Sequence, residues 1–342
     1  MRHLTIKKNI ILIIFFSVSI TNVTFPQSNT PLNTQAKNPI LSFSEQWSLM
    51  QNEYQQLCSQ AEKKDWLEYC HPTWQKTKKE INTLLNGLSH DQILNETVIR
   101  HMMVRTGFSL PQEFEFCYLK ECISNKTKQK ISKFYETDFG NFPREGREFN
   151  CTTNTLAQLF FAAKILERTE EKKIQNIVEF GGGFGSLARL MKQILPETTI
   201  FIIDLPELIA IQSLFLRSTV DNANIFVHKE IPHAFQEQAI HLIPVYLLND
   251  LNITVDLFVS TFALSEGTEK IQSYIGNTKN FFNAKFLYLV GQINGWGSQN
   301  WANHTLLFTL TRSLYEHVDC QPFHLFFPES SQLSTYEIFA QN

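Results

Sequence analysis

A glycine-rich turn between an apolar run and a helical pattern constrains this chain more than any other feature. The apolar run covers residues 174–180, the turn holds Gly181, Gly183 and Gly185, and the helical pattern covers residues 187–195. A strand, a glycine turn and a helix in this order place a nucleotide-like ligand across the carboxyl end of the strand. Glycine lets the backbone turn tightly and approach the ligand, and the helix start offers unpaired N–H groups. The stretch therefore predicts an α/β fold with a ligand site at this turn.

An acidic residue follows the turn at a spacing that suits ribose recognition. Asp204 stands 19 residues after Gly185, at the end of a second apolar run over residues 199–203. A carboxylate at this place can accept hydrogen bonds from both hydroxyls of a ribose. The turn and Asp204 together predict a ligand that contains a nucleoside.

The glycine turn fits two kinds of nucleotide ligand. Written as Gly181-x-Gly183-x-x-Ser186, it nearly matches a dinucleotide fingerprint, with serine in the last small-residue position. Written as Glu179-x-Gly181-x-Gly183-x-Gly185, it resembles the first motif of class I S-adenosylmethionine-dependent methyltransferases. Glu179 favours the second interpretation, because its carboxylate can engage the cationic end of S-adenosylmethionine but has no evident role beside a pyrophosphate. The alternative without a ligand is a tight turn beside an ordinary surface acid.

Strand and helix patterns alternate around this turn as in a doubly wound α/β sheet. The expected strands cover residues 174–180, 199–203, 239–243, 256–260, 285–291, 323–327 and 336–340. The third strand has an alternative at residues 224–227, and we favour 239–243 because it leaves a short connection to the next strand. We therefore predict a Rossmann-like methyltransferase sheet of seven strands over residues 137–342, ending in an antiparallel hairpin.

The region before this domain has helical periodicity instead. Apolar and aromatic side chains recur at helical spacing, first Trp47, Met50 and Tyr54 and then Trp66, and Trp74 follows a proline. We interpret these side chains as the core of an N-terminal helical subdomain over residues 40–135, rather than as the wall of a ligand site.

Residues 1–30 have the pattern of a signal peptide or an N-terminal membrane anchor. Arg2, Lys7 and Lys8 precede a mostly apolar run over residues 10–20, which is short for a membrane span. Export would separate the protein from S-adenosylmethionine, which is made and kept in the cytosol. The sequence leaves open a cleaved signal, an uncleaved anchor and a misassigned start, so it also leaves the location of the protein open.

The charge of the chain bears on its partners. A net charge of −3 provides no basic field for nucleic acid or anionic lipid. We therefore expect a small-molecule partner, with membrane contact only through residues 1–30 if they are retained.

The six cysteines are compatible with disulfides or with buried thiols. The sequence contains no Cys/His cluster and no carboxylates paired at ligand spacing, so we do not predict a metal site.

The segment after the fourth expected strand carries the most specific resemblance. Residues 260–266 (Ser-Thr-Phe-Ala-Leu-Ser-Glu) are similar to the sugar O-methyltransferase family, in which this strand runs into Ser-Asn-Tyr-Ala-Phe-Ser-Glu. Thr261 and Phe262 replace the Asn and Tyr of the family. Asp-Leu-Pro-Glu at residues 204–207 matches as well, and the Gly-Asn-Pro loop of the family stands at residues 140–143 with one residue inserted.

The resemblance covers roughly residues 137–289 and implies a methyl transfer from S-adenosylmethionine to a hydroxyl of a sugar or related polyol. It implies that S-adenosylmethionine is the cofactor. The residues expected to bind it are Glu179, Gly181, Gly183, Gly185, Asp204, Leu205 and Ser260. The loops at residues 139–147 and 294–301 are expected to border the pocket.

The expected catalytic residues are Glu266 and His304. Glu266 lies just past the edge of the fourth strand, where the transferred methyl should be, so it is the first candidate for the base or for the group that orients the acceptor hydroxyl. Its alternative role is that of an acid at the start of a helix. His304 and His317, after the fifth strand, are the second candidates, and each has a purely structural alternative.

Three other functions remain open on this sequence. The first is an exported enzyme of the same kind with a host acceptor, which the N-terminal segment motivates. The second is an exported binding module that keeps the fold without catalysis. The third is a nicotinamide-dependent oxidoreductase, which Glu179 and the late position of the nucleotide-binding domain disfavour.

Overall fold

The computed structural model divides the chain into two units, residues 1–39 and 40–342. It describes residues 42–64, 66, 72–87, 92, 94, 96, 99, 112–144, 149–169, 173–220, 224–292, 304–323 and 335–342, all in the second unit. The predicted signal peptide or anchor at residues 1–30 lies outside the described residues. Within the described part of the chain, no helix combines the length and the apolar character that crossing a membrane requires.

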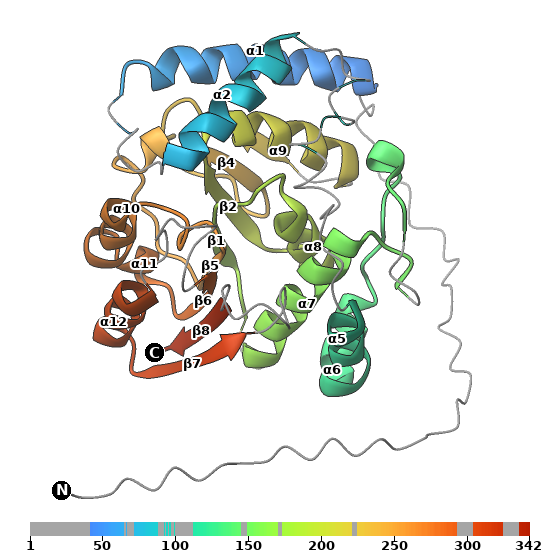
Figure 1. Ribbon diagram of the computed structural model, residues 1–342, viewed down its shortest axis with the longest axis vertical. Coiled ribbons are helices and arrows are strands. Elements are labelled where there is room, and N and C mark those ends of the chain that lie inside the picture. Colours follow the sequence, from blue (N-terminus) through green and yellow to red (C-terminus); the bar gives the residue numbers. More distant parts are fainter. Residues whose placement is uncertain are drawn as a thin grey trace, which may run out of the picture. The chain divides into compact units, whose positions relative to one another are not determined.

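Eight strands form one sheet in the order β3-β4-β2-β1-β5-β6-β8-β7 (Figure 1). Their bounds are β1 Asn176–Phe180, β2 Thr199–Asp204, β3 Ile225–Val227, β4 Ile240–Pro244, β5 Leu257–Thr261, β6 Phe286–Gln292, β7 His317–Phe323 and β8 Thr335–Gln341. Strands β1 to β6 run parallel, and β8 pairs antiparallel with both β6 and β7. The predicted doubly wound α/β sheet with a terminal antiparallel hairpin is thereby confirmed.

The sheet differs from the expectation in its two edge strands. Both runs considered for the third strand are strands, because β3 pairs in parallel with β4 at the edge, and the sheet therefore has eight strands and not seven. The hairpin begins at His317 instead of residue 323, since β7 takes its register from pairing with β8 and not from an apolar run of its own. An edge strand buries only part of its surface, so its sequence lacks the apolar pattern that marks the central strands.

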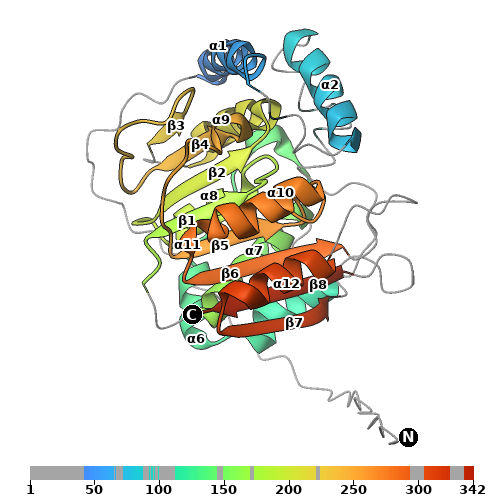
Figure 2. The same ribbon diagram turned by 90° about the vertical axis from the view of Figure 1, so that its left-hand side faces the viewer.

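Helices cover both faces of the sheet (Figure 2). In this view α10, α11 and α12 lie in front of the central strands, and α7 and α8 lie behind them. The helices that flank the sheet are α7 Thr153–Arg168, α8 Ser186–Ile194, α9 Pro206–Thr219, α10 Glu269–Ser273, α11 Asn280–Asn283 and α12 His304–Leu314. Because both faces are covered, every residue of β2 is buried, which explains its continuous apolar sequence.

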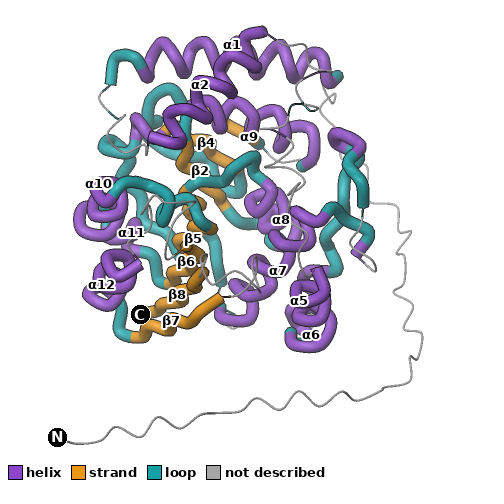
Figure 3. The backbone as a smooth tube through the Cα atoms, viewed as in Figure 1, coloured by secondary structure: helices purple, strands orange, loops and turns teal. Residues whose placement is uncertain are grey.

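The N-terminal helices belong to the same unit as the sheet, residues 40–342 (Figure 3). They are α1 Phe43–Ala61, α2 Pro72–Gly87, α5 Gln112–Cys117 and α6 Asn125–Ile131. Helix α1 starts with a capping box in which Ser42 and Glu45 satisfy each other's backbone N–H groups. It packs along α9, and α2 also contacts α9. This placement brings α2 close to the carboxyl end of β2, where α9 begins.

Candidate active site

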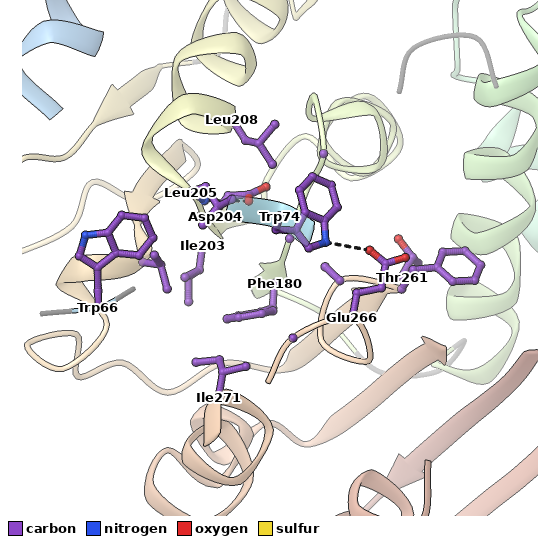
Figure 4. Close-up of a pocket in the computed structure, with 16 residues that line it drawn as sticks. Trp66, Trp74, Phe180, Ile203, Asp204, Leu205, Leu208, Thr261, Glu266 and Ile271 are labelled. Atoms are coloured by element: carbon purple, nitrogen blue, oxygen red, sulfur yellow. Dashed lines mark hydrogen bonds between the residues drawn. The ribbon is translucent and has the colours of Figure 1, made fainter. Parts of the chain in front are cut away.

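A cavity of about 180 Å³ lies at the carboxyl ends of β1, β2 and β5 (Figure 4). Four predicted cofactor residues, Gly181, Gly183, Asp204 and Leu205, line it together with the catalytic candidate Glu266. The remaining lining residues are Trp66, Trp74, Phe180, Ile203, Leu208, Val245, Thr261, Phe262, Ala263, Gly267 and Ile271. Ligands of doubly wound sheets bind at this edge, so the structure brings most of the expected site residues together where the fold predicts a ligand.

The glycine turn uses conformations that other residues rarely adopt. Gly181, Gly183 and Gly185 have φ angles of +75°, +58° and +98°. A Cβ atom on Gly181 would stand 1.9 Å from the Cβ of Ala263, because the turn after β5 packs directly on the turn after β1. A Cβ on Gly183 would have nothing within 4 Å. Gly181 is therefore required for packing, whereas Gly183 leaves space open at the cavity.

The two glycines predict different effects of alanine substitution. We expect Gly181→Ala to destabilise the protein by about 2–5 kcal/mol, since a left-handed alanine and a steric overlap both raise the free energy of the folded state. Gly183→Ala should cost only about 1–2 kcal/mol, because its strain comes from the backbone alone. Urea unfolding of both variants measures the difference, and equal losses would contradict this account of the turn.

Hydrogen bonds from the backbone and from Gln212 hold Asp204 at the end of β2. It is 7% exposed, and its Oδ1 accepts from the backbone N–H of Leu205 at 2.8 Å. Its Oδ2 accepts from Nε2 of Gln212 at 2.8 Å, and the same Nε2 donates to the carbonyl of Gly183 at 2.9 Å. Burial raises the pKa of Asp204 to about 7, although these hydrogen bonds oppose the shift. Gln212 thus fixes the carboxylate relative to the glycine turn.

The sequence analysis did not identify Gln212 as a site residue. It lies on α9 with none of its surface exposed, among apolar neighbours. A glutamine in the middle of the mostly apolar stretch at residues 208–216 is the signal that could have indicated it, because buried amides need hydrogen-bond partners.

Glu179 lies beneath the glycine turn and does not line the cavity. It is 3% exposed, and a Cβ atom on Gly182 would stand 3.5 Å from its carboxyl carbon. Its Oε2 has no hydrogen-bond partner among the described residues. Burial and the nearby charge of Asp204 raise the pKa of Glu179 to about 8. A buried carboxyl with an open acceptor, close to Gly182 of the glycine turn, fits a ligand that carries positive charge.

The raised pKa of Glu179 predicts how stability depends on pH. The folded protein keeps this proton up to about pH 8, whereas the unfolded chain releases it near the ordinary value of 4.5. The free energy of unfolding should therefore fall as the pH rises from about 5 to 8. Between pH 6 and pH 8.5 we expect the ligand-free protein to lose about 2 kcal/mol more than Glu179→Gln.

Urea unfolding at the two pH values measures this difference. The exposed Glu237 supplies a matched control, and Glu237→Gln should follow the wild type. A Glu179→Gln variant that loses as much stability as the wild type would show that Glu179 is ionised throughout this range.

Glu266 lies in the turn that follows β5. Its backbone N–H donates to the carbonyl of Phe262 at 3.0 Å, and Phe262 has a φ of +74°. Its Oε2 accepts from Nε1 of Trp74 at 3.2 Å, and Figure 4 shows this indole pointing across the cavity toward the carboxylate. A half-buried carboxylate at this edge of the sheet can accept a proton from a bound hydroxyl.

Trp66 and Trp74 contribute to the cavity, although the sequence analysis interpreted them as core. Trp66 is 2% exposed and Nε1 donates to the carbonyl of Ala61 at 3.2 Å, while Trp74 is half-buried on α2. Trp66 lies between α1 and α2, outside the described helices, although it was expected at helical spacing. A side chain that faces inward can meet a cavity as well as packed side chains. The sequence holds no signal that separates the two cases.

Besides Glu179, two further predicted cofactor residues do not line the cavity. Ser260 is 1% exposed, and its hydroxyl donates to the carbonyl of Phe180 at 2.8 Å and accepts from the N–H of Leu264 at 3.0 Å. It therefore ties β5 to β1 and shapes the turn that carries Glu266. Gly185 is the N-cap of α8, and a Cβ there would stand 3.2 Å from Leu216 of α9. Both residues support the site from behind.

The histidine candidates have different positions. His304 is the first residue of α12, and its side chain lies outside the described residues. His317 begins β7 and pairs with Gln341, which pairs with the first residue of β6, so His317 lies at the end of the sheet opposite to the cavity and away from the other candidates. His228 directly follows β3 and His241 lies on β4, so both belong to the side of the sheet that these two strands form. Nε2 of His228 lies 2.8 Å from Nδ1 of His241.

The loops expected to border the pocket are only partly described. Phe139, Phe142 and Arg144 line a separate cavity of about 30 Å³ together with Arg189, which forms a buried ion pair with Glu136 at 2.7 Å. Residues 145–148 and 294–301 lie outside the described residues. Where side chains are described, no three of His, Cys, Asp and Glu gather as a metal site would require.

One protein family matches part of the chain. Residues 116–236, about a third of the chain, match the family described as the O-methyltransferase domain. The match contains the glycine turn and Asp204, and it supports S-adenosylmethionine-dependent methyl transfer as the chemistry of this region. None of the curated proteins compared with the chain matches it.

Several solved structures are similar to the chain at low sequence identity. One is precorrin-6y C5,15-methyltransferase from Geobacter metallireducens, with 11% identity, a TM-score of 0.37, and coverage of 60% of this chain and 98% of that chain. Another is an arsenic(III) S-adenosylmethionine methyltransferase from Chlamydomonas reinhardtii, with 10% identity, a TM-score of 0.34, and coverage of 48% and 62%. These TM-scores lie below 0.5, so the fold assignment rests on the strand order and pairing described above.

Proposed function

We propose that this protein is an S-adenosylmethionine-dependent O-methyltransferase that acts on a hydroxyl of a sugar or related polyol. The observation that carries the proposal is the cavity at the carboxyl ends of β1, β2 and β5, which joins the glycine turn, Asp204 and Glu266. The O-methyltransferase domain match over residues 116–236, which contains the glycine turn and Asp204 but ends before Glu266, supports the methyl-transfer part. The sugar part rests on the resemblance of residues 260–266.

The residues present fit S-adenosylmethionine as the methyl donor. Asp204 offers carboxylate oxygens to ribose hydroxyls, and Gly183 leaves room for a ligand to approach the backbone. Glu179 places an unpaired carboxyl oxygen under the turn, where it can stabilise positive charge. When bound, the donor supplies a methyl group already activated by its sulfonium centre.

Glu266 would act on the acceptor. Its carboxylate orients the acceptor hydroxyl and takes its proton as the oxygen is methylated, which contributes roughly 10²–10⁴-fold to the rate. The apolar side chains around it, among them Phe262 and Ile271, exclude water and hold the acceptor in place. Most of the acceleration would come from this alignment.

A second candidate acceptor is a phenolic hydroxyl. Asp204, Thr261 and Glu266 are the lining residues with carboxyl or hydroxyl groups among those described, and the rest of the lining is apolar, glycine or indole. A polyol needs partners for several hydroxyls, whereas a phenol needs one and buries its ring against Trp66 or Trp74. The indoles also suit the apolar face of a sugar ring, so both acceptors enter the test.

The test measures donor binding first and acceptor choice second. Calorimetry of the full chain with S-adenosylmethionine and S-adenosylhomocysteine should give micromolar affinity. A screen with radiolabelled donor should then show transfer to sugars or polyols, and transfer to phenols alone would favour the second candidate. A folded, reduced protein that binds neither compound would contradict the enzyme and favour a non-catalytic binding module.

The exported enzyme with a host acceptor remains a separate proposal. Tracking the mature protein tests it, and a protein confined to the cytosol of the producing cell would contradict it.

A further inference from the structure

We propose that Trp74 is a positioning residue for Glu266, which orients its carboxylate and favours the ionised form. The inference rests on the proposed function, because Glu266 is assigned there as the base. Trp74 comes from α2, almost 200 residues before Glu266 in the sequence, so the N-terminal helical region completes the chemistry of the sheet.

The N–H is the single polar group of an indole, and in Trp74 it points at the carboxylate of Glu266. Nε1 of Trp74 donates to Oε2 of Glu266 at 3.2 Å, and both residues line the same cavity. The carboxylate lies in a turn that contains the left-handed Phe262. The hydrogen bond from Trp74 fixes the orientation of Oε2, and such a bond is stronger when the acceptor is charged.

The contact of Trp74 differs from that of Trp66 on the other side of the cavity. Nε1 of Trp66 donates to the backbone carbonyl of Ala61, which has no charge to gain or lose. The centre of the Trp66 ring also lies 4.4 Å from Nζ of Lys78, and this cation–π contact holds the ring in place at the side of the cavity. Trp66 therefore serves as a matched internal control, since it is an indole in the same cavity with a neutral partner.

The other titratable groups around the Trp74 contact can be separated from it. Asp204 shares the cavity, Lys78 on α2 lies 3.6 Å from Oε1 of Glu207, and two exposed residues stand at the start of α10, Glu269 and Lys270. Because Asp204 also titrates in the neutral range, an Asp204→Asn variant must accompany the pH experiments. A response that survives this variant belongs to another group.

The first experiment follows the indole N–H groups by NMR as a function of pH. In the ¹⁵N-tryptophan-labelled full chain, Trp74→Phe and Trp66→Phe assign the two signals. We expect the Trp74 signal to titrate in the wild type and in Asp204→Asn, and to become independent of pH in Glu266→Gln, while the Trp66 signal stays constant. A Trp74 signal that is flat, or that still titrates in Glu266→Gln, would overturn the inference.

The second experiment measures kinetics of Trp74→Phe, which keeps an aromatic ring but removes the donor. We expect kcat to fall about tenfold, the acidic limb of the pH–rate profile to move up by about one unit, and the affinity for S-adenosylmethionine to stay unchanged. Trp47→Phe, in a buried tryptophan of α1 away from the cavity, controls for general loosening. A tenfold loss of kcat in Trp74→Phe without any change in its pH–rate profile would assign Trp74 a merely structural role.

The two experiments separate this inference from the proposed function. If the wild type neither binds S-adenosylmethionine nor transfers methyl groups, the proposed function fails, whatever the Trp74 signal does. If the wild type is active and Trp74→Phe matches it in kcat and pH profile, the function stands and the positioning role of Trp74 fails.

Discussion

Asp204→Asn should reduce the affinity for S-adenosylmethionine by about 100-fold or more. The carboxylate lines the cavity at the end of β2, and Gln212 and the N–H of Leu205 hold it in a fixed orientation. Hydrogen bonds to a charged group contribute about 1.5–3 kcal/mol each, and asparagine replaces one acceptor oxygen by a donor. Losing one such bond to a ribose hydroxyl, together with the charge, accounts for two decades of affinity.

Calorimetry with S-adenosylhomocysteine measures this loss, and Asp256 supplies the control. Asp256 is also a buried aspartate, and its Oδ2 accepts from the N–H groups of Gln175 and Asn176 at 2.8 and 3.0 Å. It lies just before β5, at the edge of the sheet opposite to the cavity. Asp256→Asn should therefore cost stability and leave donor affinity unchanged. A comparable loss of affinity in both variants would mean that Asp204 acts through stability alone.

Glu266→Gln should lower kcat by about 10²–10⁴-fold while donor affinity stays within a factor of about two. Glutamine keeps the shape of the side chain and an oxygen for Nε1 of Trp74, but it cannot take a proton. The donor is expected at the glycine turn and Asp204, and the removal of a base beyond that region leaves its contacts intact. The change therefore affects the chemical step and not the binding step.

Single-turnover methyl transfer with saturating donor measures this effect, with Glu269→Gln as the control. Glu269 is an exposed acid in the first turn of α10, three residues further along the chain. Its variant should retain wild-type kcat. A Glu266→Gln variant of full activity would leave alignment as the source of the rate and would remove Glu266 as the base.

The sequence by itself determined the class of the fold and the place of the candidate site. The central strands are buried on both faces, so their sequences are continuous apolar runs, and β1, β2, β5 and β6 were predicted to within a few residues. The glycine turn was predictable for a similar reason, since left-handed backbone conformations at Gly181 and Gly183 require a particular residue. Local demands of this kind are written into the sequence at the position where they act.

The tertiary structure alone decided the contacts between segments far apart in the chain. The sequence assigned Trp66 and Trp74 to the core of the N-terminal region, but only the packing of α1 and α2 around α9 decides that they meet the cavity and that Trp74 meets Glu266. The same holds for Gln212 and for β3, whose partners lie elsewhere in the sequence. The residue type at one position reflects the backbone conformation and the burial at that position. The identity of a distant partner follows only from the folded arrangement of the whole chain.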